Sequence, residues 1–503
     1  MGLCPKFFQM KKSIISVMDV INDIENEFPI DQLQYHGVNW WPVLRSEIGV
    51  LARNGRVLQK VDFETENQLL KKIKLIIKLP FKTIQTFNEL FSWRKIAKKK
   101  GGKYEAPKKL DFITLSSYKH RTDLFEDFNY NRYTDPIHFF LKPYSGLNIE
   151  LLSPNLKFDN YPNSTCFYRQ ILIRCRLLND ISQIVKFENN NQLKEADKVF
   201  IDLCKHVNAK FNLNIIDLVS IKSKINEIEM YHKFFFKLFS KLNPRIVFLS
   251  SYYSGIFFGA IKAAKDFKIR IYDYQHGIQG DYHFAYSNWL NFPKNGAVFM
   301  PDFLVYNLDD KLALDKQFNT SNLPKTFVVG NLWNKLWSLK SNSQFRFDNS
   351  SDKINILFCL SPIAPFFSDF LLKYMKDSND LFWHIRLHPR YMNQKDEVVS
   401  ILSKNEIINY EIDKSSSYNL QDLIVNSDIH ITNFSSTCLD ALDLGKKSII
   451  VDQQGKLLYK KQIENGDFYY CNNELDLNKT VRNQVFKVEI DLTDAIDLKT
   501  LFN

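Results

Sequence analysis

The sequence predicts two α/β domains with parallel sheets, placed in tandem so that a cleft lies between them. Strand-like apolar runs alternate with helical patterns in two separate stretches of the chain. Short polar loops follow several of these runs, as expected for strands that deliver side chains to one edge of a sheet. The chain has 503 residues, of which 45% are hydrophobic, so it is long enough to bury a core in each domain.

The first domain is predicted to span residues 106–335. Its strands begin with Leu110 to Leu115, and its clearest unit lies further along the chain. There, the apolar run Arg245 to Leu249 precedes a polar loop, a helical pattern from Ile256 to Phe267, and a second run from Ile269 to Tyr274. A strand, a helix and a strand joined by short loops form a βαβ unit, so the sheet is expected to be parallel.

The second domain is predicted to span residues 336–480, followed by a C-terminal tail at residues 481–503. Strands and helices alternate regularly in it, which is typical of a doubly wound sheet. The predicted strands are Ile354 to Leu360, Phe382 to Leu387, Ile429 to Thr432 and Ser448 to Val451. The predicted helices between them are Phe366 to Met375, Leu420 to Asn426 and Cys438 to Leu444.

Residues 1–105 are predicted to form a helical extension with an unusual charge. The whole chain carries a net charge of +11, and residues 71–103 hold eleven Lys or Arg against one acid, Glu89. Basic residues alternate there with Leu, Ile, Phe and Trp93, which favours contact with an anionic membrane surface. An ordinary charged surface helix and a nucleic-acid patch are the alternatives, and no nucleic-acid motif elsewhere supports the latter.

The first residues and the spacing of the cysteines predict where in the cell the protein is found. The first twenty residues do not have the pattern of a signal peptide, because Pro5 and three Lys interrupt the apolar residues. The seven Cys have no paired or zinc-like spacing, which favours reduced thiols in the cytoplasm. We therefore expect a cytoplasmic protein that is peripheral at the inner face of the cytoplasmic membrane.

Two loops in the second domain carry the strongest chemical signal. His388-Pro389-Arg390 follows the strand Phe382 to Leu387, and Arg386 lies just before it. Guanidinium groups suit bidentate contacts with phosphate. The alternative is an ordinary basic turn on the surface, which would have the same sequence pattern. Ser435-Ser436-Thr437 follows the next predicted strand and precedes a helix, where hydroxyls and backbone N–H groups can bind an anion. A plain helix cap is the alternative.

The two loops are more informative together than apart. Asp440, one turn into the following helix, is placed to accept ribose hydroxyls, or else to face solvent. The combined pattern resembles the donor half of bacterial GT-B glycosyltransferases of capsule and surface polysaccharide synthesis, above all those using CMP-activated ulosonic acids. The resemblance covers roughly residues 245–452. It implies a GT-B-like fold of two Rossmann-type domains facing a cleft. It also implies that His388, Ser435 and Ser436 hold the nucleotide phosphate.

The first domain is expected to supply the catalytic base. Its strand ending at Tyr274 runs into Gln275-His276-Gly277, and enzymes of the resembled group often have Gln-His-Gly at this point. His276 is therefore a candidate base for the acceptor hydroxyl, and a structural loop histidine is the alternative. Asp281 is a second candidate, because many enzymes of this kind use a carboxylate. Gln275 and Ser251 are candidates for contact with the donor.

The sequence thus predicts a glycosyltransferase that moves a sugar from a nucleotide donor to a surface polysaccharide or a lipid-linked glycan. The donor is expected to be a CMP-linked ulosonic acid, such as a sialic-acid-like sugar or Kdo. A transferase of CDP-glycerol or CDP-ribitol and a non-catalytic glycan-binding assembly factor are the alternatives. No metal-binding motif and no cofactor motif is present, so a metal-independent reaction without a cofactor is predicted.

Overall fold

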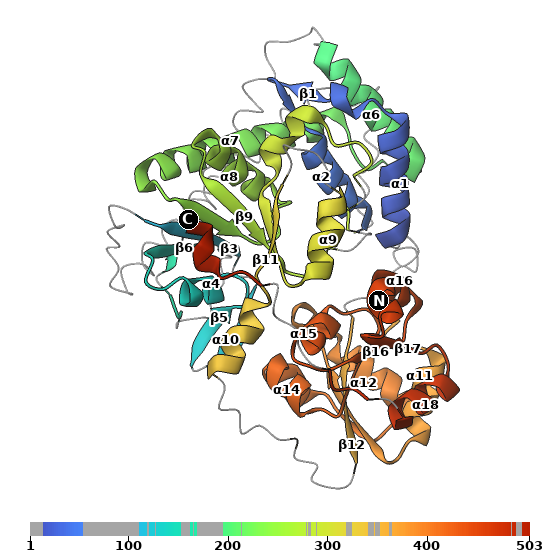
Figure 1. The fold of residues 1–503 in the computed structure, drawn as a ribbon. Coiled ribbons are helices and arrows are strands. Elements are labelled where there is room, and N and C mark those ends of the chain that lie inside the picture. Colours follow the sequence, from blue (N-terminus) through green and yellow to red (C-terminus); the bar gives the residue numbers. More distant parts are fainter. Residues whose placement is uncertain are drawn as a thin grey trace, which may run out of the picture. The chain divides into compact units, whose positions relative to one another are not determined.

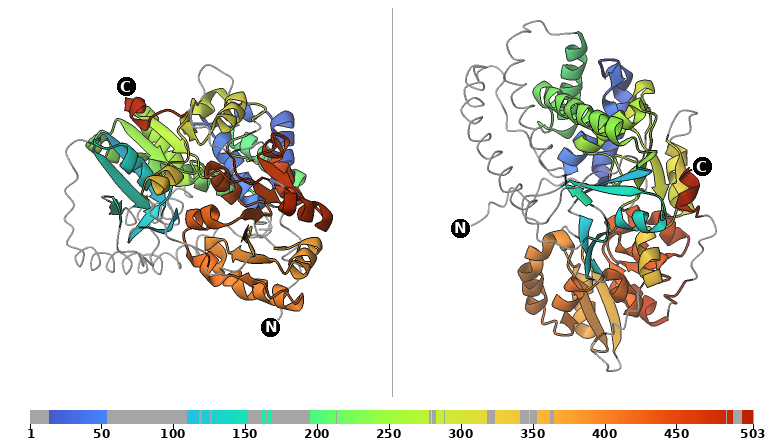
Figure 2. Two further views of the ribbon diagram at one scale, coloured as in Figure 1. Left: turned by 60° about the horizontal axis from the view of Figure 1, so that its bottom comes forward. Right: turned by 90° about the vertical axis from the view of Figure 1, so that its left-hand side faces the viewer.

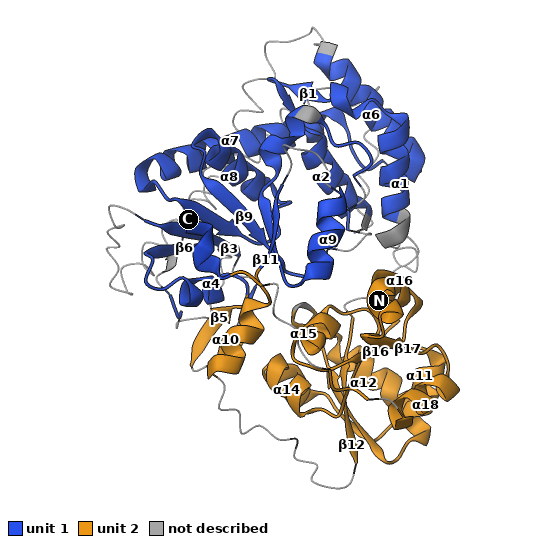
Figure 3. Ribbon diagram, in the orientation of Figure 1, with its two compact units in different colours: residues 1–121, 133–328, 497–503 blue, residues 122–132, 329–496 orange. Residues whose placement is uncertain are grey.

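The computed structural model divides the chain into two compact units (Figure 3). Unit 1 comprises residues 1–121, 133–328 and 497–503, and unit 2 comprises residues 122–132 and 329–496. Within these, the structure describes residues 14–53, 110–117, 120–125, 127–151, 161–163, 165–167, 195–212, 214–277, 279, 283–287, 289–317, 324–340, 347, 353–361, 365–483, 485–488 and 495–502. The basic segment 71–103 and Asp281 lie outside the described residues.

Unit 1 is built on a seven-stranded parallel sheet (Figure 1). The strand order is β11-β10-β9-β8-β3-β6-β7, and each neighbouring pair is parallel. The strands are β3 (Phe112–Ser117), β6 (Gly146–Leu151), β7 (Thr165–Phe167), β8 (Ile246–Leu249), β9 (Arg270–Tyr274), β10 (Asp302–Val305) and β11 (Thr326–Val328). The predicted βαβ unit is present as β8, α8 and β9, within one or two residues of its predicted bounds.

Helices pack around this sheet. They are α4 (Asp135–Phe140), α6 (Glu195–Phe211), α7 (Leu218–Leu242), α8 (Gly255–Asp266) and α9 (Leu308–Gln317), together with the 3-10 helix η4 (Lys294–Phe299). Helix α7 begins at a capping box, in which the Asp217 carboxylate accepts from the Ser220 N–H at 2.6 Å. Helices α7 and α8 lie side by side (Figure 1), and Gly259 makes this possible because a Cβ there would collide with Tyr231.

The first described helices belong to unit 1 rather than to a separate extension. These elements are α1 (Ile14–Glu27), the 3-10 helix η2 (Ile30–Gln32), the hairpin β1 (Gln34–Tyr35) and β2 (Val38–Asn39), and α2 (Trp41–Arg53). A fully buried ion pair joins the two helices, with Arg45 Nε 2.8 Å from Glu25 Oε1. Arg45 also donates to the backbone oxygens of Phe284 and Ser287, so α2 is anchored to a loop of the first domain.

Unit 2 is built on a six-stranded parallel sheet with the order β14-β13-β12-β15-β16-β17. The strands are β12 (Ile354–Cys359), β13 (Leu381–Arg386), β14 (Tyr410–Glu411), β15 (Ile429–Thr432), β16 (Ser448–Ile450) and β17 (Phe468–Tyr470). The helices are α10 (Leu332–Lys340), α11 (Asp369–Asp377), η5 (Pro389–Gln394), α12 (Lys395–Lys404), α13 (Asp413–Ser417), α14 (Leu420–Asn426), α15 (Thr437–Asp443), α16 (Gln453–Leu458), α17 (Lys460–Glu464) and α18 (Glu474–Asn483). Figure 2 shows helices on both faces of this sheet.

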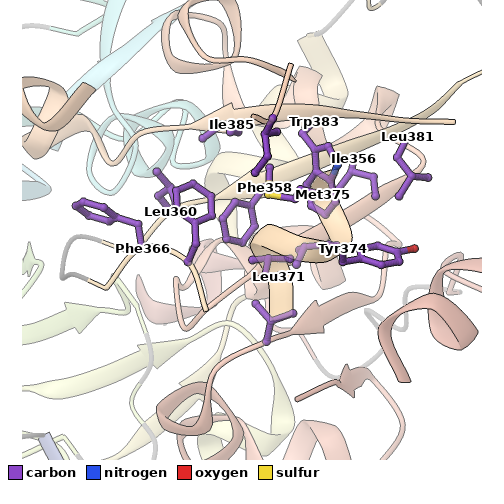
Figure 4. Packing of buried hydrophobic residues seen from close by; sticks show 14 of the residues in the cluster. Ile356, Phe358, Leu360, Phe366, Leu371, Tyr374, Met375, Leu381, Trp383 and Ile385 are labelled. Atoms are coloured by element: carbon purple, nitrogen blue, oxygen red, sulfur yellow. The ribbon is translucent and has the colours of Figure 1, made fainter. Parts of the chain in front are cut away.

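The core of unit 2 follows from the alternation of side chains along β12. Ile356 and Phe358 point to one face, where they pack in a large buried cluster with Trp383 and residues of α11, α12 and α18 (Figure 4). Leu357 and Cys359 point to the other face and pack against α14 and α15. A strand buried on both faces is almost continuously apolar, which explains why the sequence predicted it well.

Two segments belong to a different unit from the residues next to them in the chain. The hairpin of β4 (Arg121–Phe125) and β5 (Phe128–Asn131) comes from the first half of the chain, but residues 122–132 belong to unit 2. There, Phe125 and Tyr130 pack against the Trp333 ring of α10. The chain end returns to unit 1, where Phe502 of η6 (Leu498–Phe502) stacks on Tyr144 at 4.1 Å.

The prediction of two α/β domains with parallel sheets is confirmed, and some boundaries move. Unit 2 begins its second segment at residue 329, close to the predicted boundary after residue 335. The predicted tail at residues 481–503 includes the end of α18 and the segment that packs in unit 1. Within the described residues, no helix combines the length and the apolar character needed to cross a membrane.

Candidate functional site

The sheet of unit 2 has a switch point where the chain reverses its direction across the sheet. From β12 the chain continues to β13 and β14 on one side, and then returns to β15 on the other side of β12. In doubly wound sheets, ligands bind outside the carboxyl ends of the strands at this point. The two loops that flank it are in contact, because Ser361 Oγ after β12 accepts from the Phe434 N–H after β15 at 3.2 Å.

The Ser435-Ser436-Thr437 loop lies at this switch point. Thr432 Oγ1, at the end of β15, donates to the Cys359 carbonyl at 2.7 Å and accepts from the Ser435 N–H at 3.1 Å. These bonds hold the loop against β12. Ser436 is exposed, and its side chain does not cap α15. A ligand can therefore meet the Ser436 hydroxyl without displacing a capping bond.

Thr437 has a different environment from the two serines. Its hydroxyl lies 3.2 Å from His430 Nε2, and the other ring nitrogen of His430 lies 2.8 Å from Ser448 Oγ. Burial lowers the pKa of His430 to about 3, with a smaller effect from Lys446, so the imidazole is neutral at ordinary pH. Thr437 thus connects the loop to the interior of the sheet. Helix α15 has seven residues, the same length as the helix predicted from the sequence.

The loop after β13 places three predicted residues at the same edge of the sheet. Arg386 is engaged in the fold, because its Nη1 donates to the carbonyls of Ser415 at 2.5 Å and Tyr418 at 2.8 Å. Burial lowers the pKa of Arg386. His388 is half-buried and lies against the Tyr391 ring at 5.5 Å. Arg390 follows in η5, and its side chain lies outside what the structure describes.

Asp440 is held by protein groups that the sequence analysis did not identify. Its Oδ1 accepts from Arg132 Nη2 at 2.8 Å and from Asn331 Nδ2 at 3.0 Å. Arg132 comes from the β4–β5 hairpin, 308 residues earlier in the chain. The Coulombic effect of Arg132 also lowers the pKa of Arg386, after the larger effect of burial. No local pattern in the sequence pointed to Arg132, because its proximity to Asp440 depends on tertiary packing.

Unit 1 has a corresponding switch point. Its chain runs from β3 to β6 and β7 on one side, and then returns to β8, β9, β10 and β11 on the other side of β3. The Ser250–Gly255 loop follows β8, and Gln275-His276-Gly277 follows the adjacent strand β9. The two loops are in contact, because Tyr253 Oη lies 3.2 Å from His276 Nε2.

Gln275 and Ser251 shape these loops through their backbone and amide contacts. Gln275 is fully buried, and its amide bonds to Asp310 Oδ2 at 2.9 Å and to the Tyr306 N–H at 2.7 Å. Ser251 has a φ of 67°, a left-handed conformation that is uncommon for residues other than glycine. The hydrogen bonds of Gln275 thus fix the turn before His276. The left-handed conformation of Ser251 sets the direction of the chain just before Tyr253.

An aromatic cluster surrounds His276. Besides Tyr253, the rings of Tyr133 and Tyr286 lie 6.1 and 6.4 Å from the His276 ring. The carbonyl of His276 accepts from Tyr133 Oη at 3.0 Å. His283, which sequence reasoning passed over, lies 5.2 Å from the Tyr253 ring. His276 is therefore held at its backbone and at its ring.

Asp273 is the buried carboxylate at the end of β9. It is 0% exposed, and its Oδ2 accepts from Tyr286 Oη at 2.7 Å. Burial raises the pKa of Asp273 to about 8, against the smaller lowering effect of Tyr286. A fully buried carboxyl group cannot reach a substrate hydroxyl. Its hydrogen bond instead holds the Tyr286 side chain in the aromatic cluster.

The two groups of candidates lie in different units. His388, Ser435, Ser436 and Asp440 belong to unit 2, whereas His276 belongs to unit 1. The assignment of these residues to donor binding and catalysis stays a prediction. Within the described part of the chain, no group of three or more His, Cys, Asp or Glu is arranged to hold a metal ion. That the reaction needs no metal also stays a prediction.

No family model and no curated protein matches this sequence. Among solved structures, UDP-GlcNAc 2-epimerase of Methanocaldococcus jannaschii in complex with UDP-GlcNAc and UDP is 15% identical, with a TM-score of 0.44 over 78% of this chain and 98% of that chain. UDP-GlcNAc 2-epimerase from Neisseria meningitidis bound to UDP-GlcNAc is 14% identical, with a TM-score of 0.40 over 74% and 88%. A glycosyltransferase of Streptomyces sp. SF2575 is 8% identical, with a TM-score of 0.38 over 75% and 91%. TM-scores this low support no argument, so the fold rests on the strand order and the function on the site.

Proposed function

We propose that this protein is a glycosyltransferase that moves a sugar from a nucleotide donor to a surface polysaccharide or a lipid-linked glycan. One observation carries the proposal: the Ser435-Ser436 loop lies at the switch point of unit 2 and presents an exposed, uncapped hydroxyl there. A diphosphate or monophosphate group at this point would meet hydroxyl and backbone N–H donors. The loop carrying His388 follows a strand of the same sheet.

Each residue then has a stated role in unit 2. Ser435, Ser436 and His388 donate to the phosphate, and Arg390 adds positive charge. Such preformed donors stabilise the negative charge that develops as the nucleotide leaves. Arg132 and Arg386 raise the positive potential nearby, while Asn331 and Arg132 hold the Asp440 carboxylate in place for ribose hydroxyls. In the proposed reaction these groups, rather than a metal ion, neutralise the charge of the leaving phosphate.

In unit 1, His276 is the proposed base for the acceptor hydroxyl. Its half-buried ring lies beside Tyr253 at the switch point. Asp281 stays the alternative base. General base catalysis at one hydroxyl contributes about 10²- to 10⁴-fold to the rate.

The donor is proposed to be a CMP-activated ulosonic acid. The test is a binding and transfer survey of the purified protein with CMP-, CDP-, UDP- and GDP-linked donors, using thermal shift for binding. CMP and CMP-sugars should raise the melting temperature, and Ser436→Ala with His388→Ala should abolish the increase. Binding of UDP- or GDP-sugars without binding of cytidine nucleotides would refute the proposed donor.

A CDP-glycerol or CDP-ribitol transferase is the second candidate, and the burial of Asp273 favours it. Among the enzymes that the sequence resembles, many of the sialyl- and Kdo-type use a carboxylate base, whereas the glycerophosphotransferases have a His-Gly at the position of His276-Gly277 that is assigned to catalysis. With Asp273 bonded to Tyr286 and fully buried, His276 is the better placed of the two. The same survey decides, because this enzyme would transfer from CDP-glycerol and not from CMP-sugars.

The non-catalytic alternative is tested in cells. If His276→Ala and His388→Ala both leave polysaccharide production intact, catalysis through these loops is refuted. Residues 71–103 are proposed to keep the enzyme near a lipid-linked acceptor at the inner face of the cytoplasmic membrane. Co-sedimentation with anionic vesicles, compared with neutral vesicles, tests this contact, which should weaken as salt is raised.

A further inference from the structure

The two ring nitrogens of His276 lie in different surroundings. Nδ1 of the His276 ring is buried, so a ligand cannot reach this nitrogen. The other nitrogen, Nε2, lies 3.2 Å from Tyr253 Oη. A proton taken from an acceptor hydroxyl must therefore reach His276 at the nitrogen that Tyr253 already contacts.

The position of the Tyr253 hydroxyl is fixed by its ring. Tyr253 packs on His283 at 5.2 Å, and on Phe284 and Tyr286 at 5.8 Å each. The rings of Phe284 and Tyr286 meet it edge-on, at 81° and 90°. These contacts restrict the ring on several sides, so ring packing directs the Tyr253 hydroxyl at His276.

The loop that holds this ring is itself anchored from below. Arg45 donates to the carbonyls of Phe284 and Ser287, and the Phe284 ring lies over Gly49 of α2 so closely that a Cβ would collide with it. Glu25 accepts from the Leu290 N–H at 2.9 Å. Buried charged bonds of this kind are rigid, so the Tyr253 surroundings are preorganised rather than formed on binding.

A feature of the Ser250–Gly255 loop, which carries Tyr253, also indicates a ligand. Ser250, next to the strained Ser251 at the end of β8, is 4% exposed, and its hydroxyl has no hydrogen-bond partner among the residues that the structure describes. A buried hydroxyl without a partner costs free energy unless a bound group satisfies it. Because the Ser250–Gly255 loop lies at the switch point of unit 1, a ligand is expected on the side where Tyr253 lies.

We propose that Tyr253 is a catalytic residue that relays the acceptor's proton to His276, an inference that rests on the proposed function. The acceptor hydroxyl gives its proton to Tyr253 Oη while the Tyr253 proton moves to His276 Nε2. The acceptor oxygen forms its bond to the anomeric carbon as the bond from that carbon to the donor phosphate oxygen breaks. The phosphate leaves with the electron pair, Tyr253 ends neutral, and His276 ends as the imidazolium.

The decisive variant is Tyr253→Phe, which removes the hydroxyl and keeps every ring contact. We expect kcat for transfer to fall about 10²-fold, with the KM for the donor changed by less than about twofold. The matched control is Tyr252→Phe, which loses a hydroxyl bonded to the Ala285 carbonyl instead. Its kcat should stay near that of the wild type, and its melting temperature reports the cost of losing a buried hydrogen bond.

Two further measurements separate a relay from a packing role. In the relay, Tyr253→Phe in a His276→Gln background should cause no further loss, because both residues serve one proton transfer. A proton inventory in mixed water and heavy water should show two protons moving in the wild type and one in Tyr253→Phe. An additive double variant, or a kcat of Tyr253→Phe close to the wild type, overturns the relay. Absence of transfer by the wild type from every nucleotide donor overturns the proposed function, and the relay with it.

Discussion

The switch points of the two sheets have opposite chemistry. In unit 2, hydroxyls and guanidinium groups gather at the carboxyl ends of the strands, and Ser436 is exposed there. In unit 1, tyrosine and histidine rings surround a buried carboxylate, with Asp273 bonded to Tyr286. The same topology therefore presents hydroxyl and guanidinium groups in one unit and histidine and tyrosine rings in the other, which fits the anion site and the proton transfer that we propose. The side chains on the loops, rather than the fold, decide which chemistry each site supports.

The largest change in stability is expected at the buried ion pair between Arg45 and Glu25 in unit 1. Arg45→Met removes one partner of an ion pair that is fully buried on both sides, and leaves Glu25 without its cation. We expect a loss of about 3–5 kcal/mol of stability, measured by urea unfolding. Lys210→Met is the control, because its pair with Glu27 is exposed to solvent and its loss should change the stability little. Equal losses in the two variants would contradict the view that buried charge organises this site.

The pH dependence of stability tests the buried carboxylate of unit 1. Burial raises the pKa of Asp273 from 3.8 to about 8, so the folded state keeps a proton that the unfolded state releases. Its contribution to stability is complete below about pH 4 and is lost as the pH rises toward 8, by at most about 1.4 kcal/mol per pH unit. In Asp273→Asn this contribution should be absent between pH 5 and 8, whereas an unchanged profile would place the titration elsewhere.

The loop of the proposed anion site in unit 2 depends on a close backbone approach. At Gly455 a Cβ would collide with the carbonyl oxygen of Asn433, which lies at the start of the Ser435 loop. Gly455→Ala should therefore cost about 1–3 kcal/mol and weaken CMP binding by displacing that loop. Gly466→Ala is the control. Its φ of 78° brings strain, but no atom lies within 4 Å of the added Cβ, so CMP affinity should be unchanged.

The smallest effect is expected at Arg132. Arg132→Met removes the cation that pairs with Asp440 at 2.8 Å, and leaves a carboxylate near the proposed phosphate site. The added repulsion should weaken CMP binding about tenfold, as measured by calorimetry. Arg482→Met, which breaks the more exposed pair with Asp380, should leave CMP affinity unchanged. If both variants bind CMP like the wild type, Arg132 has no part in the donor site.

Much of the fold could be predicted from local patterns. Strands buried on both faces, such as β12 and β15, appear as continuous apolar runs, and their predicted bounds agree with the structure within one or two residues. The positions of the His388 and Ser435 loops followed, because each comes directly after such a strand. Helices α1 and α2 were assigned to an extension, since nothing in their sequence shows that Arg45 reaches the 284–287 loop.

The sequence by itself determined the two parallel sheets and the chemistry of the loops that follow their strands. Both are properties of short segments, in which the spacing of apolar residues reports burial and the next few residues report the turn. Only the tertiary structure decided that Arg132 holds Asp440 and that Tyr253 contacts His276. These pairs join distant segments, and their distances depend on how strands are ordered in a sheet, which no local pattern encodes.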